Sequence, residues 1–204
     1  MKYFILIAGF IASATFVNAQ KQVKTTSLEL GTIVSDPASL GLEEVNKKLT
    51  LVPINESKNT IEIRLYSSVG LSGMQCSVIE YDTKWKVFKL KVNTKDSTVK
   101  HTLKPVIPVD QIVKLMIAKN IFCLPPQDKI SKGNYKLDLS TNQVKLSAFT
   151  ISDASCYYVQ FKVGDQLREY KYCDPKAYAA FYKHHHEYAD FIAILKQFSK
   201  LEGK

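Results

Sequence analysis

Several residue types and patterns are scarce in this chain of 204 residues, and each scarcity argues against a class of protein. It has eight glycines and no glycine-rich run of the kind that cradles phosphate groups. It has two arginines, Arg64 and Arg168. Arginine is the residue that makes most of the bidentate hydrogen bonds with which proteins read bases, so few such contacts are available. We therefore expect no specific nucleic-acid partner and no cofactor.

Signatures of enzymes are also missing. Ser72 is followed directly by Gly73, which breaks the Gly-x-Ser-x-Gly spacing of a hydrolase nucleophile. The adjacent carboxylates Glu43 and Glu44 lie in a polar stretch where nothing positions an acid against a base. No Cys-x-x-Cys spacing occurs, which argues against a cysteine zinc site or a thioredoxin-like site. We expect a protein without catalytic residues.

Three consecutive histidines, His184 to His186, form the most conspicuous cluster of potential metal ligands. Successive residues of a helix point about 100° apart, so the three cannot converge on one ion. His186 and Asp190 are four residues apart and share a helix face, but a third ligand would have to come from elsewhere. We expect no metal site, and a metal-assisted hydrolase that uses His186 and Asp190 is the alternative.

Long apolar runs are confined to the start of the chain. Lys2, an apolar run and the small residue Ala19 predict a signal peptide over 1–19, with the mature chain beginning at Gln20. Beyond it no apolar run approaches the roughly 18 residues of a membrane span. The sequence thus predicts a periplasmic or secreted protein without a transmembrane segment.

The length of the expected mature chain, 20–204, suits one compact domain. Two sub-lobes within it, 20–107 and 108–204, are the alternative.

The formal charge of +9 comes almost wholly from lysines. These lysines occupy the outward half of alternating strand patterns, which indicates a solvated basic surface. The summed field of such a surface attracts acidic partners. We expect a monomer whose partner is an envelope protein, an extracellular protein or an acidic glycan.

Four cysteines, an even number in a chain expected to be exported, predict two disulfides. The runs Cys156–Val163 and Gln166–Cys173 read as strands joined by Gly164-Asp165, with glycine at the first central position of a type II′ turn. Counting outward from the turn places Cys156 opposite Cys173. The second bridge, Cys76 to Cys123, follows only by elimination.

Alternation in this hairpin separates its side chains into two faces. We expect one face to be buried, namely Tyr157, Val159, Phe161, Tyr170 and Tyr172. On the other face, Tyr158 and Lys171 are candidates for contacting a ligand. Together with Trp85 and Tyr182 they would form an exposed platform for sugar rings or apolar groups of a partner.

The remaining pattern predicts an α+β fold. Alternating runs make a meander and hairpins of antiparallel strands, with Ile61, Ile63 and Leu65 facing inward. Apolar residues at helical spacing predict two helices, about Val109–Asn120 and Pro175–Leu201. Asn120 suits the left-handed residue after the first helix, and Asp174 suits the N-cap of the second.

Several stretches together resemble a class of small exported bacterial proteins of unknown function. They are Ile61-Glu-Ile-Arg-Leu-Tyr66, Lys84-Trp85-Lys86, Ile121-Phe-Cys-Leu-Pro125 and the tyrosine-rich hairpin before an aromatic helix. The resemblance spans roughly 60–201. It implies an antiparallel sheet with two helices and carries no catalytic residue over to this chain. A ligand- or partner-binding domain is our expectation, and a disulfide-braced structural or inhibitory protein is a further alternative.

The hairpin register predicts which cysteines are linked. Digestion without reduction, followed by mass spectrometry, should yield a linked fragment that contains Cys156 and Cys173, because the register makes them cross-strand neighbours. A fragment that links Cys156 to Cys76 or Cys123 would contradict the register.

Overall fold

The computed structural model describes residues 41–68, 73–92, 97–130, 134–147, 149, 151 and 154–203. The expected signal peptide, 1–19, lies outside these residues. Among the helices within them, none combines the length and the apolar character required to cross a membrane.

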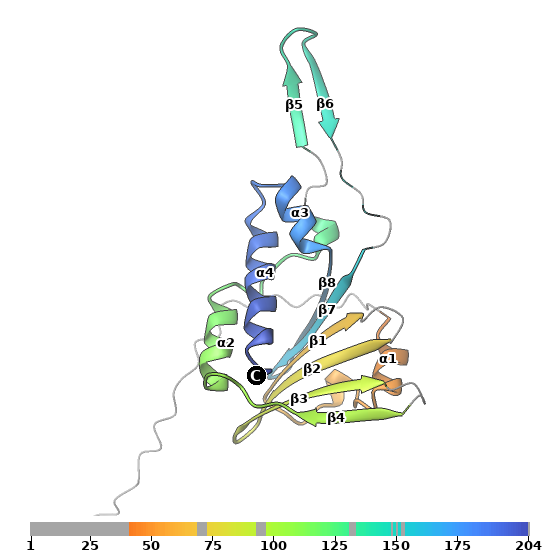
Figure 1. Cartoon of the computed structure of the whole chain (residues 1–204), viewed down its shortest axis with the longest axis vertical. Coiled ribbons are helices and arrows are strands. Elements are labelled where there is room, and N and C mark those ends of the chain that lie inside the picture. The colour runs from red at the N-terminus through yellow and green to blue at the C-terminus, as the bar shows by residue number, and fades with distance from the viewer. Residues whose placement is uncertain are drawn as a thin grey trace, which may run out of the picture.

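A six-stranded antiparallel sheet forms the centre of the fold, with the strand order β4-β3-β2-β1-β7-β8, and a separate two-stranded sheet stands beyond it (Figure 1). Strands β1 to β4 make the predicted meander, and β7 pairs with β1, so one sheet unites strands from both halves of the chain. The strands are β1 (Ile61–Ser68), β2 (Met74–Tyr81), β3 (Trp85–Val92), β4 (Thr98–Thr102), β5 (Asn134–Asp138), β6 (Gln143–Ser147), β7 (Cys156–Val163) and β8 (Gln166–Cys173).

Helices cover both faces of this sheet. On one face lie α2 (Val109–Ile117), α3 (Pro175–Phe181) and α4 (His186–Ser199), and on the other α1 (Glu43–Lys48) and a 3-10 helix (Ile54–Glu56). Two apolar cores result, one on each side of the sheet. The α+β fold is as the sequence predicts, but the second layer is not part of that prediction.

Helix α2 begins at Val109, as predicted, and ends in a Schellman motif. Asn120 has a φ of 58°, in the left-handed region expected for it. The Ile121 N–H donates to Met116 O at 3.2 Å and the Asn120 N–H to Ile117 O at 2.8 Å. These bonds satisfy the last carbonyls of the helix and fold Ile121 into the core.

The single helix predicted over Pro175–Leu201 is wrong, because the chain breaks between α3 and α4 at residues 182–185. The break lets Tyr182 turn inward, where it stacks on Tyr178 and Tyr188 with ring centroids 6.0 and 6.3 Å away. Asp174 occupies the N-cap position of α3 and Pro175 is the first helical residue, as predicted. The expected capping by the Asp174 side chain is wrong, because this residue has a left-handed φ of 38° and its side chain makes no capping hydrogen bond.

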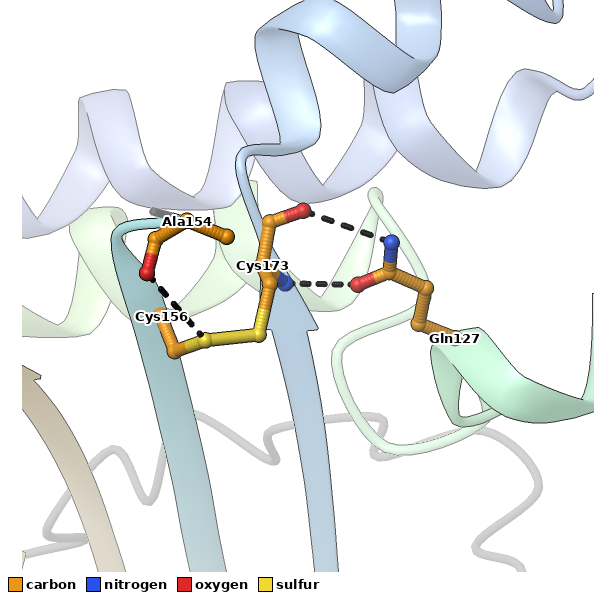
Figure 2. Close-up of a disulfide and its surroundings, with 4 residues drawn as sticks. All are labelled: Gln127, Ala154, Cys156 and Cys173. Atoms are coloured by element: carbon orange, nitrogen blue, oxygen red, sulfur yellow. Dashed lines mark hydrogen bonds between the residues drawn. A yellow bond between two sulfur atoms is a disulfide. The ribbon is translucent and has the colours of Figure 1, made fainter. Parts of the chain in front are cut away.

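The register predicted for the β7–β8 hairpin is confirmed from Val163 opposite Gln166 to Cys156 opposite Cys173. Gly164 has a φ of 58°, as the turn requires. Cys156 and Cys173 form a disulfide with their Cα atoms 4.0 Å apart. Figure 2 shows how the Gln127 amide completes this end of the sheet: the Cys173 N–H donates to Gln127 Oε1 at 2.5 Å, and Gln127 Nε2 donates to Cys173 O at 3.3 Å.

The second bridge expected by elimination is wrong, since Cys76 and Cys123 are not joined. Cys76 points from β2 into the core beneath α1, whereas Cys123 follows α2 and packs against the core on the opposite side of the sheet. The sheet itself therefore separates the two sulfur atoms. Burial raises the pKa of the Cys76 thiol, which keeps it protonated and unreactive.

The buried face of β8 secures the segment that follows α2. Arg168 donates to Phe122 O at 2.9 Å and to Leu124 O at 2.6 Å. Tyr170 and Tyr172 donate to the carbonyls of Ile121 and Pro125. This face of the hairpin is therefore a row of donors that satisfies an irregular stretch of buried backbone.

These contacts predict that Arg168→Met lowers the free energy of unfolding by about 3 kcal/mol, because two buried carbonyls lose a charged donor. Denaturant unfolding would measure the change. The matched control is Lys176→Met on the exposed surface of α3, which should change stability by less than about 0.5 kcal/mol. Equal effects of the two substitutions would contradict this role.

Candidate functional site

The candidate site lies on the sheet face that α1 covers, and alternation in β1 creates it. Ile61, Ile63 and Leu65 face the large helical core, as predicted. The residues between them, Glu62 and Arg64, therefore face the other way, and both are buried. The sequence pattern indicated a solvated outer face, but the segment before β1 folds over this face and removes it from water.

Glu62 and Arg64 form an ion pair in which each side chain is 2% exposed. Arg64 Nε lies 2.6 Å from Glu62 Oε1, and Arg64 Nη2 lies 2.5 Å from the same oxygen. Burial by itself lowers the pKa of Arg64, but the neighbouring Tyr66 and Glu62 outweigh burial and raise it. The guanidinium is therefore a permanent buried cation.

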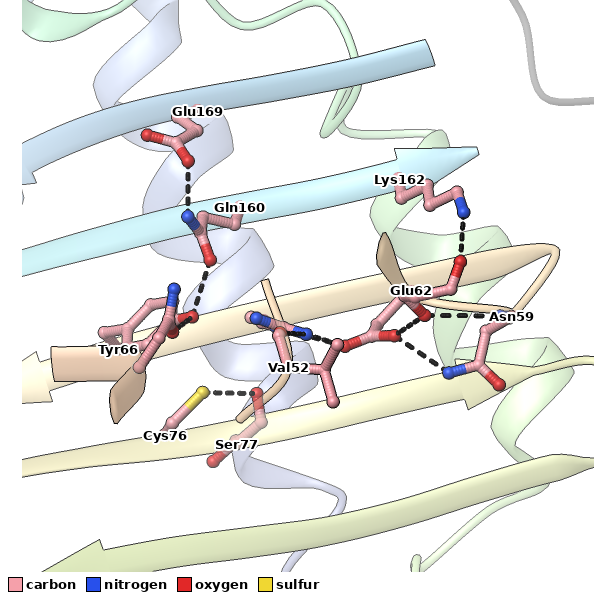
Figure 3. A network of polar contacts seen from close by, with 12 residues as sticks. Val52, Asn59, Glu62, Tyr66, Cys76, Ser77, Gln160, Lys162 and Glu169 are labelled. Carbon is pink, nitrogen blue, oxygen red and sulfur yellow. Dashed lines mark hydrogen bonds and ion pairs between the residues drawn. The ribbon is translucent and has the colours of Figure 1, made fainter. Parts of the chain in front are cut away.

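The chain between α1 and β1 is fixed to this pair (Figure 3). Arg64 Nη2 donates to Val52 O at 2.8 Å. Ser57 Oγ and Asn59 Nδ2 donate to the second carboxylate oxygen of Glu62, the latter at 2.8 Å. The segment 50–59 is thus held across the sheet by charge-assisted hydrogen bonds, which are stronger than neutral ones.

A polar row continues from this pair across β1, β7 and β8. Tyr66 Oη lies 2.6 Å from both Asn46 Oδ1 and Gln160 Oε1. Gln160 in turn donates to Glu169. Burial raises the pKa of Tyr66, so its hydroxyl stays protonated and serves as a donor. This row ties α1 to the middle of the sheet.

Beside the ion pair, a pocket of about 520 Å³ opens between the segment 50–59 and strands β1 to β4. Phe88 and Leu90 of β3 supply apolar surface, and Lys100 Nζ of β4 lies 3.6 Å from the centroid of the Phe88 ring. Leu51 and Val52 add further apolar surface. The polar residues of the lining are Thr50, Glu56, Ser57, Lys58, Asn59, Glu62, Arg64, Glu80 and Thr98. Its volume falls in the range typical of small-molecule sites.

Two carboxyl groups in this pocket oppose each other, because Glu62 of β1 is the cross-strand partner of Glu80 of β2. Like charges in directly opposed positions destabilise a sheet. Burial raises the pKa of Glu80, and Glu62 raises it further, against the lowering effect of Lys100 and Lys86. The pocket therefore holds one carboxylate that is paired with Arg64 and one that is costly to ionise.

The residues expected to form an exposed aromatic platform are not brought together. Tyr158 and Lys171 do lie side by side, with Lys171 Nζ 5.1 Å from the Tyr158 ring centroid. Trp85 packs on Tyr81 and against the helical core, on the opposite side of the sheet. Tyr182 is 1% exposed, because the break between α3 and α4 turns it inward. A shared platform of these rings does not exist.

His186 and Asp190 also lie apart from any cluster of ligands. The His186 side chain is largely exposed near Glu187, and Asp190 Oδ1 lies 3.1 Å from Lys119 Nζ. In the part of the chain that the structure describes, no three His, Cys, Asp or Glu side chains are grouped so that they could hold a metal ion.

Fold and site together define an α+β protein with a small-molecule-sized pocket on a covered sheet face. The chain matches no protein-family model, no curated protein and no solved structure.

The pocket residues were missed in the sequence, although one signal for them is present. Glu62 and Arg64 have opposite charges at positions i and i+2 of a strand, so they share a face and can pair. Such a pair occurs on buried and on solvent-exposed sheet faces, so it does not show that this face is buried. What covers it is the segment 50–59. The sequence suggests a strand over 49–54 that is ended or edged by proline, but the structure has a 3-10 helix at Ile54–Glu56, so the path of this segment was not predicted.

The raised pKa of Glu80 predicts how stability changes with pH. Below the ordinary glutamate pKa of about 4.3 the side chain is protonated in both the folded and the unfolded state. As pH rises, the unfolded state loses the proton first, and the folded state is progressively disfavoured. Glu80→Gln should therefore match the wild type near pH 3.5 and become the more stable protein toward pH 7.

Denaturant unfolding of both proteins across this pH range would measure the difference. Glu44→Gln, at an exposed position in α1, is the matched control and should show no such pH-dependent gain. A stabilising effect of Glu80→Gln that is largest at low pH would contradict the assignment.

Proposed function

We propose that this chain is an exported, non-catalytic binding protein whose ligand is a small polar molecule held in the pocket between the segment 50–59 and strands β1 to β4. The observation that carries the proposal is the position of Glu80 opposite Glu62 in a pocket of about 520 Å³. A carboxyl group that costs stability is typical of functional sites, where activity and stability conflict.

The lining indicates the chemistry of the ligand. Glu62 and Arg64 neutralise each other, which leaves Glu56 and Glu80 against Lys58 and Lys100. This balance favours a neutral or zwitterionic molecule over a strongly charged one. Hydroxyl and amide groups offer further hydrogen bonds, and Phe88 and Leu90 offer an apolar surface for one face of the ligand. Sugars and amino acids have these properties.

Binding without catalysis is favoured because the Glu62 carboxylate already makes hydrogen bonds within the protein. The carboxylate of Glu62 is buried and receives hydrogen bonds from Arg64, Ser57 and Asn59. It is thus a poor candidate for a base or a nucleophile, which must reach the reacting atom. Glu56 and Glu80 remain as carboxyl groups, and no histidine or cysteine is among the residues that line the pocket.

Export is favoured by the predicted signal peptide together with the disulfide between Cys156 and Cys173, because disulfides persist in oxidising compartments. Reduced Cys76 does not conflict with this location, since it is fully buried. A periplasmic or secreted binding protein is consistent with both features.

The proposal is tested by thermal-shift screening of the mature chain against neutral sugars, amino acids and organic acids, with calorimetry on the compounds that stabilise it. Glu80→Gln and Lys100→Met should each weaken binding roughly tenfold or more, because a charge-assisted hydrogen bond contributes about 1.5–3 kcal/mol. The matched controls are Glu44→Gln and Lys84→Met, both at exposed positions.

Two outcomes would contradict the proposal. Equal affinities of pocket and control variants would place the ligand elsewhere. Recovery of the ligand in a chemically changed form after incubation, by mass spectrometry, would make the protein an enzyme.

A further inference from the structure

The hairpin of β5 and β6 stands away from the rest of the fold, like an arm (Figure 1). Its sheet has no third strand among the described residues. Isolated two-stranded hairpins are only marginally stable in water. An arm of this kind therefore gains stability from a surface that it can contact.

Three aliphatic side chains gather toward the tip of this arm. Leu137 and Val144 are directly opposed in the register and so share one face of the ribbon. They are 55% and 65% exposed, and Leu139, in the turn, is 85% exposed. An aliphatic residue this exposed at the end of a projecting turn is well suited to entering an apolar medium.

Cationic residues accompany the apolar tip. Lys136 and Lys145 occupy directly opposed positions in the register, one step from Leu137 and Val144. These two lysines add positive charge to the sequence of the arm, which favours attraction to an anionic surface. The whole chain carries a formal charge of +9, so its long-range field adds to the attraction.

The base of the arm is attached to the helical layer. Phe149, two residues beyond β6, stacks on Phe181 with ring centroids 5.0 Å apart. Its N–H donates to Tyr182 Oη at 3.1 Å. A contact made at the tip would therefore orient the domain as a whole.

We propose that the β5–β6 hairpin docks the protein on the anionic surface of a lipid bilayer, with Leu137, Leu139 and Val144 entering the boundary between headgroups and acyl chains. Apolar side chains combined with basic residues give reversible binding of this kind. A protein partner is less well matched, because specific interfaces cover about 800 Å² on each side and need a larger apolar centre than three side chains at a tip.

Co-sedimentation of the mature chain with vesicles tests the proposal. Starting the chain at Gln20 keeps the apolar leader out of the measurement. We expect binding to vesicles of phosphatidylcholine with phosphatidylglycerol, weaker binding to phosphatidylcholine alone, and a decrease with added salt. Val144→Asp should weaken binding at least tenfold. Val106→Asp, at a position that is equally 65% exposed but outside the arm, should leave it unchanged.

A second variant keeps the test independent of folding defects. In Leu139→Trp the new indole should shift its fluorescence to the blue with anionic vesicles and be quenched by brominated lipids. Glu80→Gln should bind vesicles like the wild type, which separates this proposal from the pocket. Absence of binding to anionic vesicles, or equal losses in Val144→Asp and Val106→Asp, would overturn it. So would a dimer that Val144→Asp dissociates while vesicle binding is unaffected.

Discussion

The buried ion pair between Glu62 and Arg64 is the contact on which the second face of the sheet depends. Removing two charges from water costs several kcal/mol per ion, and only close pairing with further hydrogen bonds offsets this cost. Here Ser57, Asn59 and the carbonyl of Val52, all in the segment 50–59, supply such bonds. The pair thus determines where this segment crosses the sheet and where the pocket opens.

The two faces of the sheet differ in what covers them. On the helical side, Arg168, Tyr170 and Tyr172 satisfy backbone carbonyls in the segment after α2, so the most aromatic part of the chain is structural. On the other side, polar groups remain beside apolar ones around a pocket. The proposed ligand site and the tip of the proposed membrane arm consist of residues that are not part of the large core.

Local chemistry made several features predictable. The turn at Gly164 fixes the hairpin register and with it the Cys156–Cys173 bridge. Asn120 ends α2 because it tolerates a left-handed backbone. The prediction of a continuous helix after Pro175 failed because periodicity shows only which residues are apolar. The inward turn of Tyr182 depends on aromatic rings from α3 and α4 and on the hydrogen bond that the Phe149 N–H donates to its hydroxyl.

The sequence by itself determined the antiparallel meander, the closing hairpin and the inward residues of β1, since these follow from alternation and turn geometry within one stretch of chain. Tertiary structure alone decided that Glu62 and Arg64 are buried, that Cys76 and Cys123 lie on opposite sides of the sheet, and that a pocket exists. The physical reason is that alternation shows which residues share a face but not what covers it. What covers a face depends on contacts between segments that lie apart in the sequence.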